Sequence, residues 1–120
     1  MNKSQAIQRF WSSFGLPAYD QYTVPQNAQM PYITYSVDET QFGYPVSLTG
    51  NLWYRSQSWE DIELKSYEIS KAISSGKVFP IADGYMWIYK GTPFAQRMTD
   101  SDDTVRRIFM NITAEFLTAD

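Results

Sequence analysis

Three carboxylates in one short segment are the residues of this chain best placed to do chemistry. Asp100, Asp102 and Asp103 lie within residues 99–103, and several oxygen ligands close together suit a hard cation such as Ca²⁺. The segment lacks the central glycine and the closing bidentate glutamate of an EF-hand loop. We therefore expect no metal site here, and we interpret these aspartates as solvated turn residues or as ion-pair partners of nearby arginines. Those arginines are Arg97, Arg106 and Arg107.

The side chains that usually carry nucleophilic and acid–base catalysis are absent from the sequence. The chain has no His and no Cys, which removes the usual base for activating a serine, the thiolate nucleophile and cysteine-based metal sites. Glu60 and Asp61 are adjacent in a segment that we expect to be helical, so they point about 100° apart and cannot flank one bond. The helix dipole explains acids at this position. We predict no catalytic centre, no metal and no cofactor.

The composition indicates a single globular domain that spans residues 1–120. With 43% hydrophobic and 19% charged residues, the chain can bury a core and does not resemble a disordered protein. Aromatic residues make up 17%, which a core and a protein-binding surface explain equally well. The net charge of −3 disfavours nucleic-acid binding, because phosphate backbones attract Lys and Arg. Neither a signal peptide nor a membrane-spanning stretch is recognisable, so we expect a soluble protein.

The spacing of apolar residues predicts two helices, each with one apolar stripe. In residues 4–14 apolar side chains recur at intervals of three and four, and Ser4 is the expected N-cap. Residues 58–74 begin with Ser58 and Asp61 at the spacing of a capping box. Both segments are polar on the opposite side, so we expect both helices to cover a sheet.

Strand patterns occupy most of the remaining chain. Residues 32–37, 46–54, 85–90 and 105–117 read as strands, with a shorter one at 78–81, whereas 16–30 and 91–104 read as loops. The fold class predicted is therefore α+β, with a mixed, mostly antiparallel sheet of four to five strands and two helices packed on one face. The residues expected in the core are Phe10, Trp11, Phe14, Leu52, Ile62, Ile69, Trp87, Ile88, Ile108, Met110 and Ile112.

Two predicted loops carry large side chains suited to binding a protein partner. Residues 38–45 contain Phe42 and Tyr44, and residues 91–103 contain Phe94, Arg97 and Met98. Aromatic, Arg and Met side chains are enriched in interface cores, and loops on a rigid scaffold commonly carry binding. A loop that folds back over its own sheet explains the second segment equally well. We take these five residues, together with Asp100, Asp102 and Asp103, as candidate partner-binding residues.

Several stretches of the sequence resemble a family of proteins encoded in the head–tail module of phages and prophages of Gram-positive bacteria. They are residues 10–19, 30–35, 52–56, 91–98 and 106–108, and the resemblance covers nearly the whole chain. The family is that of the tail-terminator, or tail-completion, proteins of long-tailed bacteriophages. One departure is the single Gly84 before the strand at 85–90, where the family has a glycine-richer turn.

The resemblance implies a structural role in virion assembly. A tail terminator typically forms a hexameric ring that caps the tail tube, ends its polymerisation and offers a surface to the head connector. The implied partners are further copies of this chain, the major tail-tube protein and the head connector or completion protein. The implied location is the virion tail, after synthesis in the host cytoplasm, and free subunits are expected to be able to wait as monomers.

Two other kinds of function remain open on the sequence. One is a head-completion or connector protein of the same module, and the other is a monomeric protein-binding module. A small enzyme that depends on carboxylates is disfavoured, because no pair of carboxylates converges in the predicted structure.

Overall fold

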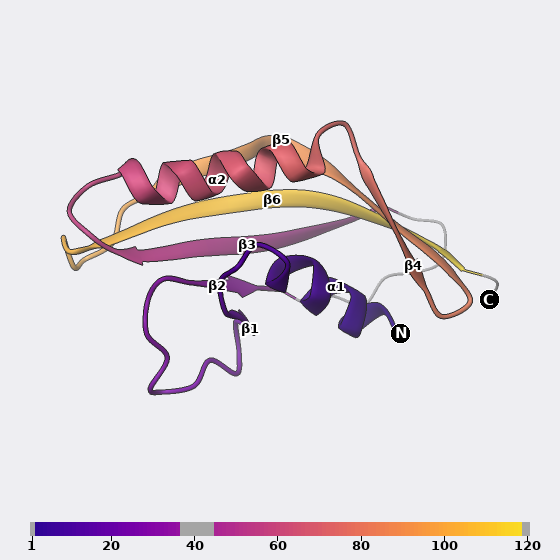
Figure 1. Cartoon of the computed structure of the whole chain (residues 1–120), viewed down its shortest axis with the longest axis horizontal. Coiled ribbons are helices and arrows are strands. Elements are labelled where there is room, and N and C mark those ends of the chain that lie inside the picture. The colour runs from indigo at the N-terminus through magenta and orange to yellow at the C-terminus, as the bar shows by residue number, and fades with distance from the viewer. Residues whose placement is uncertain (1, 37–44, 119–120) are drawn as a thin grey trace.

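The chain folds as an α+β structure in which two helices pack on one curled sheet of six strands (Figure 1). The computed structural model describes residues 2–36 and 45–118. The helices are α1 (Lys3–Ser12) and α2 (Glu60–Ile73). The strands are β1 (Ala18–Asp20), β2 (Tyr32–Tyr35), β3 (Val46–Arg55), β4 (Lys77–Ile81), β5 (Gly84–Met98) and β6 (Val105–Thr118).

The sheet is mixed and mostly antiparallel, as the sequence predicts, but it has six strands and not four to five. Its order is β1-β2-β3-β6-β5-β4, and only the β1–β2 pair is parallel. The additional strand is β1, which lies inside the segment predicted to be a loop. Its Ala18 pairs with Ile33 of β2. A strand of three residues is too short to show a period of two, so the pattern could not reveal it.

Helix α1 begins earlier than predicted because its N-cap is Asn2 and not Ser4. The Asn2 side chain accepts a hydrogen bond from the backbone N–H of Gln5 at 2.8 Å, and the Gln5 side chain accepts one from the backbone N–H of Asn2 at 2.9 Å. This reciprocal pair is a capping box, and Asn caps a helix at least as well as Ser. The helix then buries Phe10 and Trp11, as predicted.

Helix α2 begins at Glu60, two residues later than predicted, and Ser58 does not form the predicted capping box with Asp61. The N-cap position is Trp59, without a side-chain cap, while the Ser58 hydroxyl accepts a hydrogen bond from the backbone N–H of Glu60 at 3.1 Å. Acidic side chains in the first turn stabilise the helix, because they interact favourably with the positive end of its dipole. Neither helix of the described residues has the length and apolar character needed to cross a membrane.

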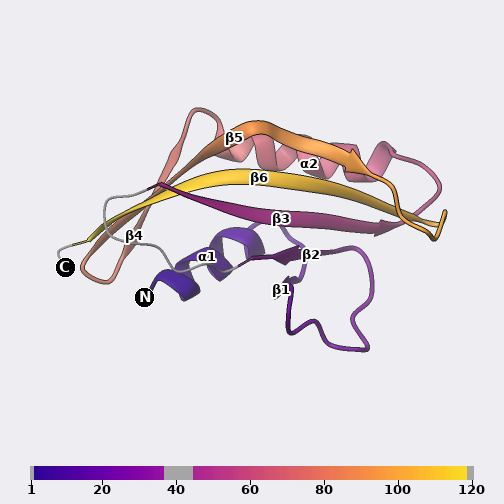
Figure 2. The same cartoon turned by 180° about the vertical axis from the view of Figure 1, so that it is seen from behind.

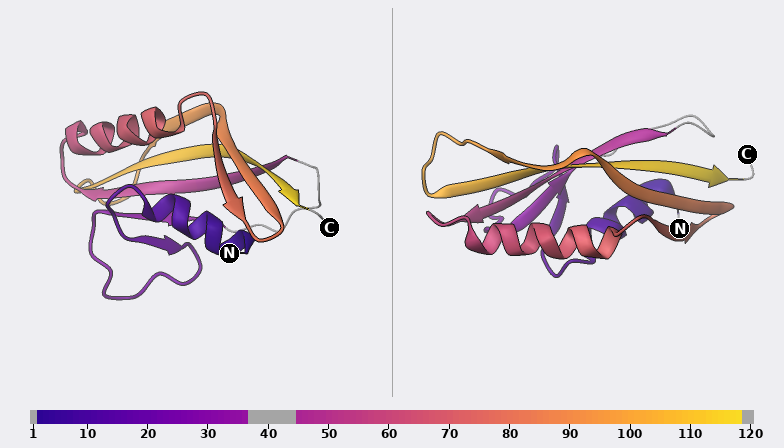
Figure 3. Two further views of the ribbon diagram at one scale, coloured as in Figure 1. Left: turned by 45° about the vertical axis from the view of Figure 1, so that its right-hand side comes forward. Right: turned by 90° about the horizontal axis from the view of Figure 1, so that it is seen from above.

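Both helices contribute to one core cluster on one face of the sheet. Even-numbered residues of β3, β5 and β6, such as Leu52, Met86 and Ile112, point into this cluster and are fully buried. Gly50 of β3 lets α1 approach closely, because a Cβ at this position would lie 2.7 Å from a ring carbon of Trp11. The right-hand view of Figure 3 shows both helices on the same side of the long strands.

Ten of the eleven residues predicted to form the core are buried, and Trp87 is the exception at 37% exposure. Met86 and Ile88 on either side of it point into the core. Since successive side chains of a strand point to opposite faces, Trp87 must lie on the other face.

The segment predicted to be a loop at 91–104 is mostly strand. Strand β5 continues through it to Met98, and its pairing with β6 shifts register between Lys90 and Ala95. Gly91 and Pro93 lie inside this irregular stretch. Glycine and proline are tolerated in a strand where its ladder is interrupted, so the residues that suggested a loop mark a bulge in a long strand.

Candidate functional site

The face of the sheet opposite the two helices carries the candidate site, and we call it the open face. Figure 2 shows the sheet with α2 on its far side, and within the described residues neither helix lies over the open face. Because side chains alternate along a strand, the residues between the buried ones point to this face. Its large side chains form two groups, one near each end of β6.

The first group, the aromatic row, crosses the sheet from β1 to β5 near the start of β6. Tyr32, Trp53, Arg107 and Met98 are direct neighbours in register across β2, β3, β6 and β5. Tyr19 of β1 extends the row, with its ring centroid 5.7 Å from that of Tyr32. The aromatic row therefore consists of Tyr19, Tyr32, Trp53, Arg107 and Met98, all of which are half-buried.

Contacts within the aromatic row hold its side chains in place. The rings of Tyr32 and Trp53 lie 6.5 Å apart, and the Arg107 guanidinium carbon lies 5.2 Å from the Trp53 ring centroid. The Trp53 indole N–H donates a hydrogen bond to the Thr34 hydroxyl at 2.8 Å. Aromatic stacking and a cation over a ring are each favourable by about 0.5–1.5 kcal/mol. The aromatic row is thus ordered in the free chain.

A hollow of about 320 Å³ adjoins the aromatic row. Its lining includes Tyr32 of the row, Arg55 at the end of β3, and Met30 from the loop before β2. Arg55 also donates a hydrogen bond to the Thr104 hydroxyl at 3.0 Å. The row is therefore bordered by a depression with a basic side chain on its wall.

The second group, the apolar patch, lies on β4, β5 and β6 near the end of β6. Val78 is the register neighbour of Trp87, and Tyr85 is that of Leu117. These four side chains define the patch, and their exposed fractions range from 37% to 58%. Clustered exposure of large apolar side chains is uncommon on a monomer and marks interaction surfaces.

One carboxylate lies within the apolar patch. Glu115 is the register neighbour of Trp87 and accepts a hydrogen bond from the Tyr89 hydroxyl at 2.9 Å. This hydrogen bond is the main reason that the pKa of Tyr89 is raised, with smaller contributions from burial and from the Glu115 charge. The tyrosine stays neutral at ordinary pH, so Glu115 supplies the negative charge of the patch.

Two tyrosines on the helix side, the buried Tyr35 and the half-buried Tyr54, also have raised pKa values. Burial is the largest cause for Tyr35, followed by the charge of Asp20. Burial is likewise the largest cause for Tyr54, followed by the charges of Asp61 and Glu68. A raised pKa keeps each phenol protonated, which fits a packing role.

The structure does not bring Phe94, Arg97 and Met98 together on one loop surface. Phe94 packs against the core, with the Lys90 ammonium 5.6 Å from its ring centroid. Arg97 lies on the helix side, where its Nε donates to Glu63 at 2.7 Å and its guanidinium carbon lies 4.6 Å from the Trp59 ring centroid. Met98 alone points to the open face, because β5 continues as a strand through all three residues.

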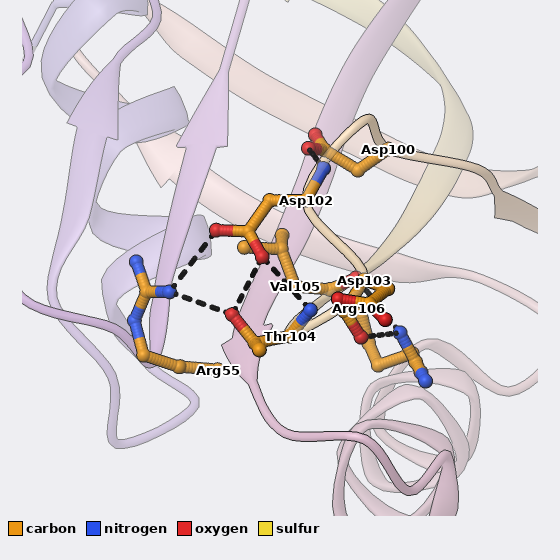
Figure 4. A network of polar contacts seen from close by, with 7 residues as sticks. All are labelled: Arg55, Asp100, Asp102, Asp103, Thr104, Val105 and Arg106. Atoms are coloured by element: carbon orange, nitrogen blue, oxygen red, sulfur yellow. Dashed lines mark hydrogen bonds and ion pairs between the residues drawn. The ribbon is translucent and has the colours of Figure 1, made fainter.

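The segment with Asp100, Asp102 and Asp103 is a turn between β5 and β6 that satisfies its own polar groups (Figure 4). One Asp102 oxygen accepts hydrogen bonds from the Thr104 hydroxyl at 2.7 Å and from its backbone N–H at 2.9 Å. These bonds, the hydroxyl first, lower the pKa of Asp102. An Asp100 oxygen accepts from the backbone N–H of Asp102 at 3.0 Å.

The ion-pair partner of this turn differs from the predicted ones. Asp102 pairs with Arg55 at 3.4 Å, while Arg97 pairs with Glu63 and Arg106 donates to the backbone oxygen of Asp103 at 2.8 Å. Arg55 is the last residue of β3, and its register partner is Val105 at the start of β6, so it lies beside the turn. Among the described residues, no group of three or more acidic side chains is arranged to hold a metal ion.

Sequence reasoning missed most of the open face. The predicted site residues Phe42 and Tyr44 lie outside the described residues. The sequence does not identify the following residues as binding residues: Tyr19, Tyr32, Trp53, Arg107, Val78, Tyr85, Trp87 and Leu117. A sequence signal for an uncovered apolar face was present in residues 85–90. This strand carries large apolar side chains on both of its faces, although the two helices can cover only one face of the sheet.

Comparison of the chain with protein-family models, with curated proteins and with solved structures gave no match. A function must therefore be inferred from the sequence and from the two groups of the open face. These groups offer ordered aromatic and apolar surface, a single acidic side chain in the apolar patch and a basic one in the aromatic row.

Proposed function

We propose that this chain is a structural subunit of a phage tail that caps the tail tube, ends its polymerisation and helps to join the tail to the head. The tail-specific part of this proposal comes from the resemblance of the sequence to tail-terminator proteins. The observation that supports a binding role is the open face, where aromatic and aliphatic side chains remain uncovered in the described part of the chain.

The chemistry of the open face is that of a protein interface. Trp, Tyr and Arg are the side chains that most often dominate binding energy, and the aromatic row combines all three. Because neighbouring contacts already order Trp53 and Arg107, little conformational entropy remains to be lost when a partner binds. The apolar patch adds surface whose burial is favourable by about 25 cal/mol per Å².

The two groups are far enough apart to contact two different partners. Arg107 and Leu117 both lie on β6, ten positions apart. At roughly 3.3 Å per residue, that separation is about 33 Å. A ring subunit that caps a tube needs surfaces for its two neighbours and a further surface for the tube, and the open face provides two of these surfaces.

The proposed assembly follows from these requirements. Copies of the chain form a ring, for which the resemblance implies six subunits, at the end of the tail tube. One side of the ring binds the major tail-tube protein and the other binds the head connector or completion protein. No chemical step is needed, because capping requires only that the last tube subunits be covered.

The experiment is the assembly of tail tubes from purified tube protein in the presence of this chain. Wild-type protein is expected to halt elongation and give short tubes of narrow length distribution, measured by electron microscopy. Trp53→Ala removes the centre of the aromatic row and is expected to give long, uncapped tubes. Tyr22→Ala is the matched control, since Tyr22 is an aromatic residue of the loop after β1 that is 83% exposed. Tubes of unlimited length with wild-type protein would refute the proposal.

A further inference from the structure

Two exposed apolar surfaces of this molecule lie on opposite sides. Among the described residues, seven large apolar side chains are exposed, and four of them form the apolar patch. Two others, Leu64 and Tyr67, lie on α2 with exposed fractions of 61% and 62%. We call Leu64, Tyr67 and Lys71 the outer stripe of α2.

The outer stripe points directly away from the core. The buried residues of α2 are Ile62, Ser66, Ile69 and Ile73. With about 100° per residue, Leu64, Tyr67 and Lys71 lie within about 60° of one another on the opposite side of the helix. Since α2 covers the helix side of the sheet, the outer stripe and the open face are directed to opposite sides of the molecule (Figure 3).

The charges of the two surfaces are opposite. On the outer stripe, the Lys71 ammonium lies 5.4 Å from the Tyr67 ring centroid. The neighbouring Glu68 is paired with Lys65 at 3.1 Å, and Lys71 makes no ion pair with another described residue. Glu60 is exposed on the same side of α2, but it lies at the start of the helix, eleven positions before Lys71. The apolar patch carries Glu115, which accepts a hydrogen bond from Tyr89 and makes no ion pair with another described residue.

We propose that the apolar patch of one copy binds the outer stripe of α2 of a second copy. Leu64 and Tyr67 pack on the exposed rings and aliphatic side chains of the patch, and Lys71 pairs with Glu115. This contact deepens the proposed function and rests on it, because it is the subunit contact that a ring requires.

The opposite charges also decide the symmetry of the contact. A twofold contact through the apolar patch alone would bury both Glu115 carboxylates in one interface without the Lys71 ammonium, and it would leave the outer stripe uncovered. A contact between two different surfaces satisfies both charges and repeats from copy to copy. Such a head-to-tail contact closes into a ring when the rotation between neighbours divides a full turn.

Disulfide cross-linking tests this contact cleanly, because the natural chain has no cysteine. Leu117→Cys and Tyr67→Cys place one thiol on each surface, where both side chains are exposed. The variant with both substitutions is expected to form a ladder of oligomers when a concentrated solution is oxidised. A mixture of the two single variants is expected to form cross-linked dimers and nothing larger, and each single variant alone is expected to give no cross-linked product.

Two outcomes would overturn the proposed contact. Dimers of the Leu117→Cys variant alone would show a twofold contact, and the absence of any ladder from the double variant would show that these surfaces do not meet. Circular dichroism of each variant shows whether its fold is retained. A ladder with the double variant supports the contact.

A charge exchange gives an independent check. Lys71→Glu is expected to reduce cross-linking of the double-cysteine chain at least tenfold, and adding Glu115→Lys is expected to restore it. If restoration fails, the pairing of Lys71 with Glu115 is wrong. The tube-length assay separates this inference from the proposed function, since capping by wild-type protein without the cross-links would refute only the subunit contact, and failure to cap would refute the function.

Discussion

Replacing Gly50 with alanine tests the close packing of α1 on the sheet. The added Cβ would lie 2.7 Å from Trp11 Cη2 and 3.0 Å from both Cζ2 and Cζ3. Carbon atoms in favourable contact are about 3.5–4.0 Å apart, so three atoms of one rigid ring would overlap with the new methyl group. The Trp11 ring is fully buried and its centroid lies 4.9 Å from that of Phe10, so it has little room to move.

The magnitude follows from two opposing effects. Overpacking a close-packed core costs about 1–3 kcal/mol, and overlap with three ring atoms places Gly50→Ala in the upper half of that range. Alanine in a strand is favoured over glycine by about 0.5–1 kcal/mol. We therefore expect Gly50→Ala to lower the free energy of unfolding by about 1–2.5 kcal/mol.

Urea denaturation in two backgrounds measures this effect. The shorter ring in Trp11→Phe removes the overlapping atoms, so Gly50→Ala in that background is expected to cost at least about 1 kcal/mol less than in the wild-type chain. A cost below about 0.5 kcal/mol in the wild-type chain, or equal costs in both backgrounds, would show that α1 does not pack across Gly50 as described.

Three further predictions concern the core, the helix side and the turn before β6. Ile112→Ala removes a fully buried side chain of β6 and is expected to cost about 2–5 kcal/mol by urea denaturation, and a loss below half a kilocalorie would place Ile112 at the surface. Arg97→Ala breaks an exposed ion pair with Glu63 and a contact over Trp59, so it is expected to cost no more than about 1–2 kcal/mol, and a larger loss in the same assay would contradict that account. The pKa of Asp102 is lowered in the folded chain. The stability that Asp102 contributes is therefore fully present above the ordinary carboxyl pKa of about 3.9, and it is lost as the pH falls through the lowered pKa of the folded chain. Thr104→Val removes the first cause of that shift and should raise the pKa of Asp102 in a carboxyl-carbon NMR titration, whereas an unchanged pKa would contradict the role of the Thr104 hydroxyl.

The sequence predicted the main elements because their patterns are long. The apolar stripes of both helices and the alternation in β3 and β6 identify α1, α2 and the centre of the sheet. Alternation in β6 placed Ile108, Met110 and Ile112 in the core, where the structure has them. Over ten or more residues a period is distinct enough to outweigh a single exception such as Phe109, an aromatic residue at an otherwise polar position of β6.

Local composition misled where tertiary pairing decides the structure. Gly91 and Pro93 read as turn residues, but pairing with β6 carries β5 past them through a shift of register. Residues 85–89 are all aromatic or apolar, so the sequence alone places Trp87 in the core, and only the positions of the helices decide which face is covered. For the same reason the open face was not predicted, since Trp53 and Arg107 become neighbours only through the β3–β6 register.

The most direct test of the central claim is to locate this chain in incomplete phage particles. Headless tails and tailless heads are purified separately from cells infected with phages blocked in head or in tail-tube assembly, and the chain is detected by immunogold electron microscopy. Our account predicts one cluster of label at a single end of each headless tail and none on tailless heads. Label on tailless heads with bare headless tails would contradict it and would identify the chain as a head-completion protein.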